Sequence, residues 1–86
     1  MADHIRKMLL AALSAGRFGH APSVHVREAV VAGDRELRTD QLGFDSLAWM
    51  EFCISVELQS GQELTPEDVE NMSYVYEIEE WLRARL

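Results

Sequence analysis

Three residues near the middle of the chain, Asp45, Ser46 and Leu47, precede a long apolar stretch. A serine in this place could act as a nucleophile, cap a helix or carry a modification. The nucleophile elbow G-x-S-x-G is absent, because Phe44 and Ala48 occupy its glycine positions. A catalytic triad needs a histidine beside the serine, and all three histidines come earlier in the chain, where nothing fixes them near it. Local sequence therefore favours a cap, which accepts a hydrogen bond from a backbone N–H of the first helical turn.

A modified serine is the other interpretation that stays open. Free N–H groups and the helix dipole favour an anion at a helix N-terminus, so a phosphate attached to Ser46 would be well placed. Gly43 allows the chain to turn sharply before the serine and keeps the site uncrowded.

Other residues that could do chemistry form no recognised pattern. His20, His25 and Cys53 lack the spacing of metal ligands, and no phosphate-binding loop, dinucleotide motif or calcium loop occurs. Cys53 falls on the core face of the predicted helix and is interpreted as a small hydrophobe. We therefore predict no catalytic residue, no metal site and no enzymatic activity for the chain alone.

Length, composition and charge narrow the class of protein. The 86 residues, of which 48% are hydrophobic, predict a single domain covering 1–86, and the lone cysteine fits a reducing, cytoplasmic setting. Six bases and four acids give residues 1–38 a net charge of +2, whereas two bases and eleven acids give residues 39–86 a net charge of −9. The acidic half would repel nucleic acid and attract a basic protein partner, although solubility alone also explains such a charge.

Apolar periodicity predicts an all-α fold. The expected helices cover residues 3–15, 46–59, 66–71 and 74–85, with N-caps at Asp3, Ser46, Thr65 and Ser73, an acid of a capping box at Asp68, and stops at Gly16 and Gly61. Their expected buried stripes are Ile5, Met8, Leu9, Ala12 and Leu13 in the first helix and Val75, Ile78, Leu82 and Leu86 in the last. The first stripe favours a helix over a signal peptide, and no stretch is long enough to span a membrane.

The segment 17–41 is predicted to be a long irregular connection. Val24 and Val26 alternate with His25 and suggest a short extended piece, and residues 28–32 leave room for one helical turn. A long connection in a small domain packs some of its own side chains, and the candidates are Val24, Val26, Val30 and Leu37. The predicted fold is a four-helix bundle with this long loop between helices one and two and a short third helix.

The helix that follows Ser46 has two apolar faces. At about 100° per residue, one face holds Trp49, Phe52, Cys53 and Val56, and the other holds Leu47, Met50, Ile54 and Leu58. The first face is the expected core face, with the burial of Trp49 left open. The second is either more core or an exposed strip edged by acids, which is typical of a partner-binding helix.

The residues Leu42-Gly43-Phe44-Asp45-Ser46-Leu47 resemble the attachment motif L-G-x-D-S-L of acyl carrier proteins. The resemblance continues in step from Asp40 to Leu82, about half of the chain, and includes the short segment Thr65-Pro66-Glu67-Asp68-Val69. The stretch Asp45-Ser46-Leu47-Ala48-Trp49-Met50-Glu51 is closest to the carriers of type II polyketide synthases.

The resemblance implies a function for Ser46. A phosphopantetheinyl transferase would attach 4′-phosphopantetheine from coenzyme A to this serine, flanked by Asp45 and Leu47. The arm would carry acyl groups as thioesters between partners such as an acyltransferase, a ketosynthase or an adenylating ligase. The carrier is expected to be monomeric and not to bind a membrane.

Two further sets of residues follow from the resemblance. Partners would dock on the second helix, through Asp45, Leu47, Met50, Glu51, Ile54 and Glu57. An acyl cleft between helices two and three would be lined by Phe52, Leu64, Val69 and Met72.

The sequence departs from the family pattern at several points. Ala48 replaces an acid that is frequent in fatty-acid carriers, the acids of the helix are sparse, and the basic connection 17–38 cannot be matched. A peptidyl or aminoacyl carrier is one alternative, although Asp45 argues mildly against it because such carriers more often read Gly-Gly-x-Ser or Gly-His-Ser around the site. A helical adaptor without a cofactor is the other.

Overall fold

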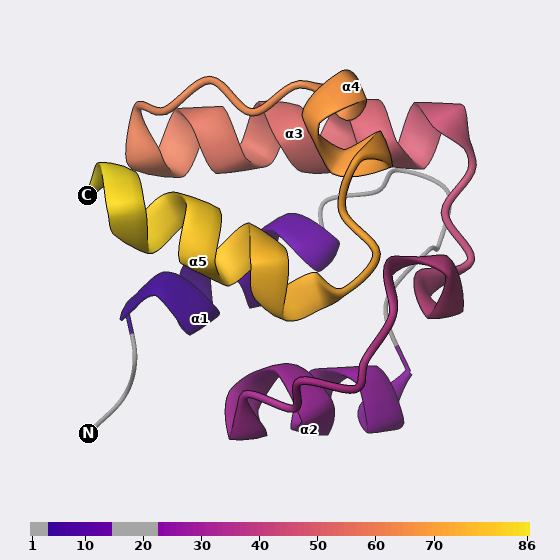
Figure 1. Cartoon of the computed structure of the whole chain (residues 1–86). Coiled ribbons are helices and arrows are strands. Elements are labelled where there is room, and N and C mark those ends of the chain that lie inside the picture. Colours follow the sequence, from indigo (N-terminus) through magenta and orange to yellow (C-terminus); the bar gives the residue numbers. More distant parts are fainter. Residues whose placement is uncertain (1–3, 15–22) are drawn as a thin grey trace.

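Five α-helices and one short 3₁₀ helix form the computed structural model, which describes residues 4–14 and 23–86 (Figure 1). In chain order the elements are α1 His4–Leu13, α2 Val24–Ala32, the 3₁₀ helix Thr39–Leu42, α3 Ser46–Ser60, α4 Pro66–Glu70 and α5 Val75–Arg85. The described residues contain no β-strand beyond a single bridge between Arg38 and Tyr74. The all-α class is confirmed, with one α-helix more than predicted.

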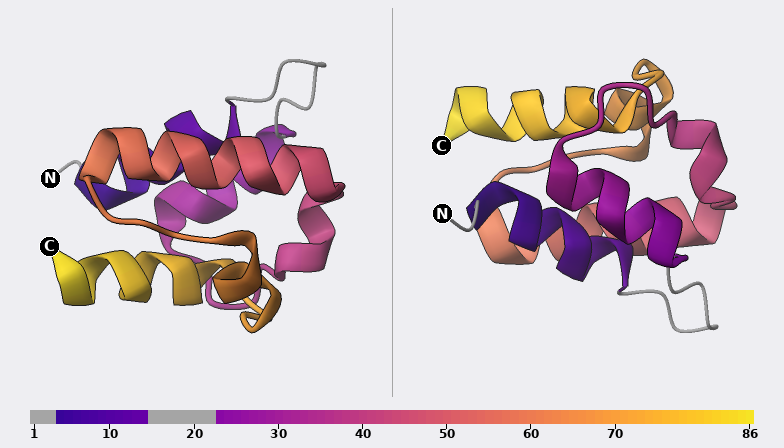
Figure 2. Two further views of the ribbon diagram at one scale, coloured as in Figure 1. Left: turned by 90° about the horizontal axis from the view of Figure 1, so that it is seen from above. Right: turned by 90° about the horizontal axis from the view of Figure 1, so that it is seen from below.

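The helices enclose one core. In Figure 1, α3 crosses the top of the molecule and α2 lies at the bottom, with α1 and α5 between them, and the two views of Figure 2 agree. Helix α1 packs against α2, α3 and α5, and α4 packs against α3. The largest side chains in the centre are Phe52, Leu9, Leu13, Ile78, Leu82 and Val56.

The predicted stripes of the first and last helices are largely correct. Met8, Leu9, Ala12 and Leu13 of α1 are buried, with Ile5 half-buried. Val75, Ile78 and Leu82 of α5 are buried, but Leu86 follows the last turn and is exposed, so its place in the stripe was wrong. The predicted N-cap Asp3 and the stop at Gly16 lie outside the described residues.

Helix α2 corrects the prediction of an irregular connection. The side chain of Ser23 accepts a hydrogen bond from the backbone N–H of Val26 at 3.3 Å and so caps a nine-residue helix. Gly33 ends that helix with φ at 69°, a conformation that glycine adopts without strain. The alternating valines therefore belong to a helix and not to an extended piece, because these two caps satisfy its free backbone groups.

The four side chains expected to pack in this segment have different positions. Val30 and Leu37 are buried in the core, and Val26 is half-buried against it. Val24 is 70% exposed, so the prediction was wrong for this residue. Val24, in the first turn of α2, borders an open hollow together with Leu10 and Val31 and does not reach the core.

Asp45, and not Ser46, caps α3. The Asp45 carboxylate accepts a hydrogen bond from the backbone N–H of Ala48 at 2.8 Å, while its own backbone is extended. Ser46 is the first helical residue, which leaves its side chain outside the capping position. The helix ends before Gly61, as predicted.

The caps of the last two helices were predicted with one error. Thr65 and Asp68 form a reciprocal capping box at α4, which starts with Pro66 as expected. The backbone N–H groups of Ser73 and Tyr74 both donate to the Glu77 carboxylate, at 2.6 and 2.9 Å. Tyr74 therefore occupies the N-cap position of α5, and the prediction of Ser73 as the cap was wrong.

Arg6 ties three helices together. Its Nε donates to Glu79 of α5 at 2.5 Å, and its Nη1 donates to the backbone carbonyl of Val31 in α2 at 3.3 Å. This ion pair is partly buried, with the Glu79 side chain 12% exposed, so salt screens it less than it screens a surface pair.

No helix among the described residues has the length and apolarity that crossing a membrane requires.

The cap assignment predicts how α3 responds to substitution. We expect Asp45→Ala to lower the free energy of unfolding by about 1 kcal/mol, the usual effect of losing an N-cap side chain. Asp45→Asn keeps an acceptor and should retain most of the stability, and Ser46→Ala should change it by less than about 0.5 kcal/mol. Urea unfolding followed by circular dichroism measures all three, and a Ser46→Ala loss equal to that of Asp45→Ala would contradict the assignment.

Candidate functional site

Ser46 lies exposed at the N-terminus of α3. Gly43, three residues before Ser46, ends the 3₁₀ helix with φ at 67°, and the chain then turns through Phe44 and Asp45 into α3. Because Asp45 takes the capping bond, the serine side chain is not needed to satisfy the helix terminus. An exposed hydroxyl at the positive end of a helix is open to modification by another protein.

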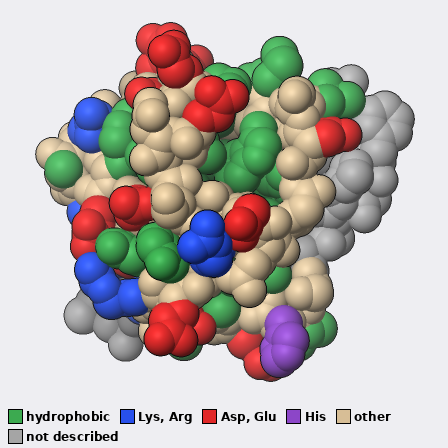
Figure 3. Space-filling model, turned by 45° about the vertical axis from the view of Figure 1, so that its right-hand side comes forward, with side chains coloured by type: hydrophobic (Ala, Val, Ile, Leu, Met, Phe, Trp, Pro, Cys, Tyr) green, Lys and Arg blue, Asp and Glu red, His purple; other side chains and the backbone are tan. Residues whose placement is uncertain are grey.

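A groove of about 790 Å³ opens beside Ser46. Its walls come from the 3₁₀ helix, the start of α3, and the region of α4. The lining residues are Thr39, Asp40, Phe44, Asp45, Ser46, Trp49, Met50, Pro66, Val69, Glu70 and Met72. Figure 3 shows the face that holds this end of α3, where hydrophobic side chains gather in the upper half beside acidic ones.

Two aromatic rings, Phe44 and Trp49, form the inner wall of the groove, and a third, Phe52, lies behind them. Trp49 packs edge-to-face on Phe44, with ring centroids 5.0 Å apart, and on Phe52, with centroids 5.4 Å apart. Phe52 is buried, whereas Trp49 and Phe44 are half-buried and line the groove. The burial of Trp49, which the sequence left open, is therefore partial: the side chain packs on the core and also borders the groove.

The four predicted cleft residues separate into two pairs. Val69 and Met72 line the groove beside Ser46. Phe52 and Leu64 are buried in the core and are not among its lining residues. Phe52 reaches the groove only through Trp49, which packs on it.

The structure resolves the two apolar faces of α3. Phe52, Cys53 and Val56 are buried in the core. On the other face, exposure is 48% for Leu47, 51% for Met50, 57% for Ile54 and 80% for Leu58. The second face is therefore an exposed apolar strip, and we call these four residues the α3 strip. Beside it, Glu57 is exposed and Glu51 is half-buried.

Several groove residues were missed from the sequence. Thr39 and Asp40 lie in the segment that was predicted to be irregular, and the place of Thr39 in the wall depends on contacts with residues more than 30 positions away. Pro66 and Glu70 belong to the predicted third helix, where only Val69 was singled out. An apolar residue in a short amphipathic helix is a visible signal, whereas a polar residue at the edge of a groove is not.

Two titratable groups near the core have shifted pKa values. Hydrogen bonds from the backbone N–H and the hydroxyl of Thr65 lower the pKa of the Asp68 carboxyl group. Burial, with a smaller contribution from the negative charge of Asp68, raises the pKa of the Cys53 thiol to about 11. Cys53 is thus a protonated core residue at neutral pH and not a nucleophile.

The described residues offer little else for catalysis. In residues 4–14 and 23–86, no histidine hydrogen-bonds to the Ser46 hydroxyl, and no cluster of His, Cys, Asp and Glu could hold a metal ion. His20 lies outside the part of the chain that is described. The arrangement is an exposed serine between an apolar groove and an exposed apolar strip.

Comparisons of the chain with protein-family models, with curated proteins and with solved structures find no significant match. The functional argument therefore depends on the residues of this site and on the motif around Ser46.

Proposed function

We propose that the chain is an acyl carrier protein with 4′-phosphopantetheine attached to Ser46. The observation that carries the proposal is the exposed serine at the first position of α3, between the groove and the α3 strip. The motif Asp45-Ser46-Leu47 supplies the chemical identity of the attached group, through its resemblance to carrier proteins. The carrier would act in the cytoplasm as a monomer, together with partner enzymes.

The attachment step needs only a hydroxyl from this chain. The Ser46 oxygen attacks the phosphorus next to the pantetheine of coenzyme A, and adenosine 3′,5′-bisphosphate leaves. The transferase supplies the base that takes the proton of the hydroxyl. The product is a phosphodiester anion at the N-terminus of α3, where the helix dipole stabilises negative charge.

The groove and the α3 strip would serve different steps of the carrier's work, namely holding the acyl chain and binding partner enzymes. The groove, walled by Trp49, Val69 and Met72, would shelter an acyl chain between reactions. The α3 strip, with Asp45, Glu51 and Glu57 beside it, would meet partners that carry basic and apolar residues. The expected partners are the transferase, and then an acyltransferase, a ketosynthase or an adenylating ligase of a polyketide-type pathway.

Two alternatives account for the same site. An aminoacyl or peptidyl carrier would use the same serine chemistry with an adenylating enzyme and a different cargo. A cofactor-free adaptor would use the α3 strip alone, with Ser46 unmodified.

Transfer of the arm in solution tests the proposal. The purified chain is incubated with coenzyme A and a broad-range phosphopantetheinyl transferase, and its intact mass is measured. We expect a mass gain of one phosphopantetheinyl group in the wild type and none in Ser46→Ala. The absence of a gain in the wild type would contradict the carrier function, and a gain in Ser46→Ala would contradict the choice of residue. Loading with candidate acids then separates acyl from aminoacyl cargo.

The rate of the same reaction tests the docking surface. We expect Met50→Ala and Glu51→Lys each to slow modification severalfold, because the first removes apolar contact and the second reverses a charge. Val31→Ala and Glu63→Lys are matched controls at exposed positions of α2 and of the loop after α3. Equal rates of modification in all four variants, with unchanged circular dichroism, would show that the α3 strip does not take part in docking.

A further inference from the structure

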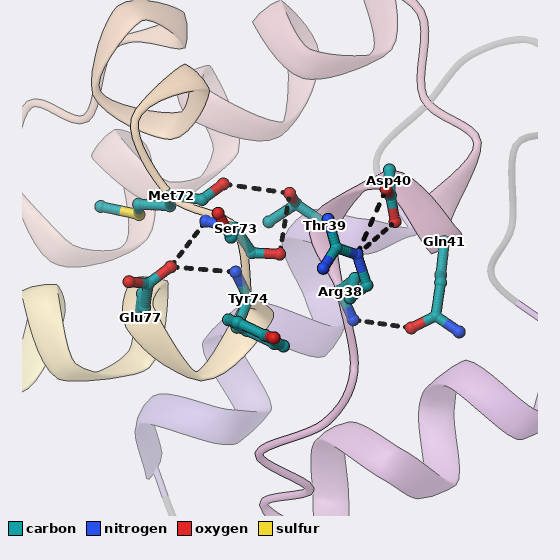
Figure 4. A network of polar contacts seen from close by, with 8 residues as sticks. All are labelled: Arg38, Thr39, Asp40, Gln41, Met72, Ser73, Tyr74 and Glu77. Carbon is teal, nitrogen blue, oxygen red and sulfur yellow. Dashed lines mark hydrogen bonds and ion pairs between the residues drawn. The ribbon is translucent and has the colours of Figure 1, made fainter.

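The chain segment 37–39, which precedes Ser46, is hydrogen-bonded to the segment 73–75, which leads into α5. The backbone N–H of Val75 donates to the Leu37 carbonyl at 2.9 Å, and the N–H of Thr39 donates to the Ser73 carbonyl at 3.0 Å. Figure 4 shows this junction from close by. The two backbone bonds hold the chain segments antiparallel around the single bridge between Arg38 and Tyr74.

A side chain adds a third bond to this junction. The Thr39 hydroxyl donates to the Met72 carbonyl at 3.1 Å and lies 3.4 Å from the Ser73 carbonyl (Figure 4). The bond to Met72 is partly buried, so its loss would leave a carbonyl with poor access to water. On the other side of the junction, the Glu77 carboxylate holds the N–H groups of Ser73 and Tyr74.

This junction lies at the groove beside Ser46. Thr39 and Met72 both line it, from opposite sides of the hydrogen bond that joins them. The aromatic part of the lining is held by a different interaction, the edge-to-face packing of Trp49 on Phe44 and Phe52. The Met72 N–H also donates to the Val69 carbonyl at 2.9 Å, so the Thr39 hydroxyl is one of two groups that hold the Met72 backbone and set its position relative to Trp49.

We infer that Thr39 is a positioning residue that fixes the width of the groove for acyl cargo. The inference extends the proposed function, since it assigns a specificity role at the same site. Thr39 does not need to touch the cargo, because it acts through Met72. The hydroxyl is the part of the side chain that matters, since the backbone bond to Ser73 is made whatever residue stands at position 39.

The charges around the groove narrow the class of cargo. Asp40, Asp45 and Glu70 contribute carboxylates to its lining, which includes no lysine or arginine among the described residues. Arg38, outside the lining, forms an ion pair with Asp40 at 3.3 Å, so Asp45 and Glu70 contribute most of the negative charge. These carboxylates disfavour a cargo that ends in its own carboxylate. The groove is therefore suited to an uncharged, apolar acyl chain that reaches Val69 and Met72.

The test uses the unmodified chain and a free mimic of the loaded arm. S-hexanoyl pantetheine is titrated into protein with labelled methyl groups, and the shifts of Val69 and Met72 are followed by NMR. S-acetyl pantetheine is the short control ligand. The variants are Thr39→Val, which keeps the shape and loses the hydroxyl, and Thr39→Ser, which keeps the hydroxyl. Ser60→Ala removes a different hydroxyl-to-carbonyl bond, to Val56 at the far end of α3, and controls for general stability.

We expect saturable shifts at Val69 and Met72 with the hexanoyl ligand in the wild type. Thr39→Val should weaken that binding severalfold, because Met72 is then held less firmly and the groove loses the width that suits the hexanoyl chain. Thr39→Ser and Ser60→Ala should stay within about twofold of the wild type, and the acetyl ligand should respond to none of the changes.

Three results would overturn the inference. The first is the absence of a shift at Val69 and Met72 in the wild type. The second is a Thr39→Val variant that binds the hexanoyl ligand as tightly as the wild type does. The third is a Thr39→Ser variant that binds it as weakly as Thr39→Val does. Failure of the carrier function shows in another measurement, because the mass gain at Ser46 does not depend on Thr39.

Discussion

The burial of one face of α3 is the interaction on which the rest of the structure depends. Phe52, Cys53 and Val56 fill the centre between α3 and α1, and each large apolar side chain contributes about 1.5–3 kcal/mol when fully buried. This packing fixes the rotation of α3 about its own axis. Once it is fixed, the α3 strip must face outward.

The site combines parts that are held by independent interactions. The Asp45 carboxylate caps α3, so the Ser46 side chain is not needed as a cap. The packing of Trp49 on Phe44 holds the aromatic wall of the groove, and the bridge between Arg38 and Tyr74 holds the segment that contains Thr39. The exposed serine needs no catalytic neighbour in its proposed role, because the enzymes that load and unload the arm bring their own. In that proposed role, an exposed attachment point on a rigid helix would suit a small domain that has to enter the active sites of its partners.

Features that depend on short-range sequence were predictable, and those that depend on distant contacts were not. The stripes of α1 and α5 and the capping box of Thr65 and Asp68 follow from residues within one or two turns. Helix α2 was missed because its valines resemble a strand, while the burial of Val30 against the core favours the helix. The cap of α3 was misplaced by one residue because aspartate and serine are equally good caps, and only backbone conformation separates them. The wall at Thr39 depends on a bond to Met72, 33 residues away, which no local pattern reveals.

The attachment of the arm to Ser46 is most directly tested by a peptide map of the chain purified from the cells that produce it. Cleavage after glutamate yields the peptide Leu37–Glu51, which contains two hydroxyl side chains, Thr39 and Ser46. The account predicts that fragmentation places a phosphopantetheinyl group on Ser46 and leaves Thr39 bare. A peptide found only in its unmodified form, or with the group on Thr39, would contradict it.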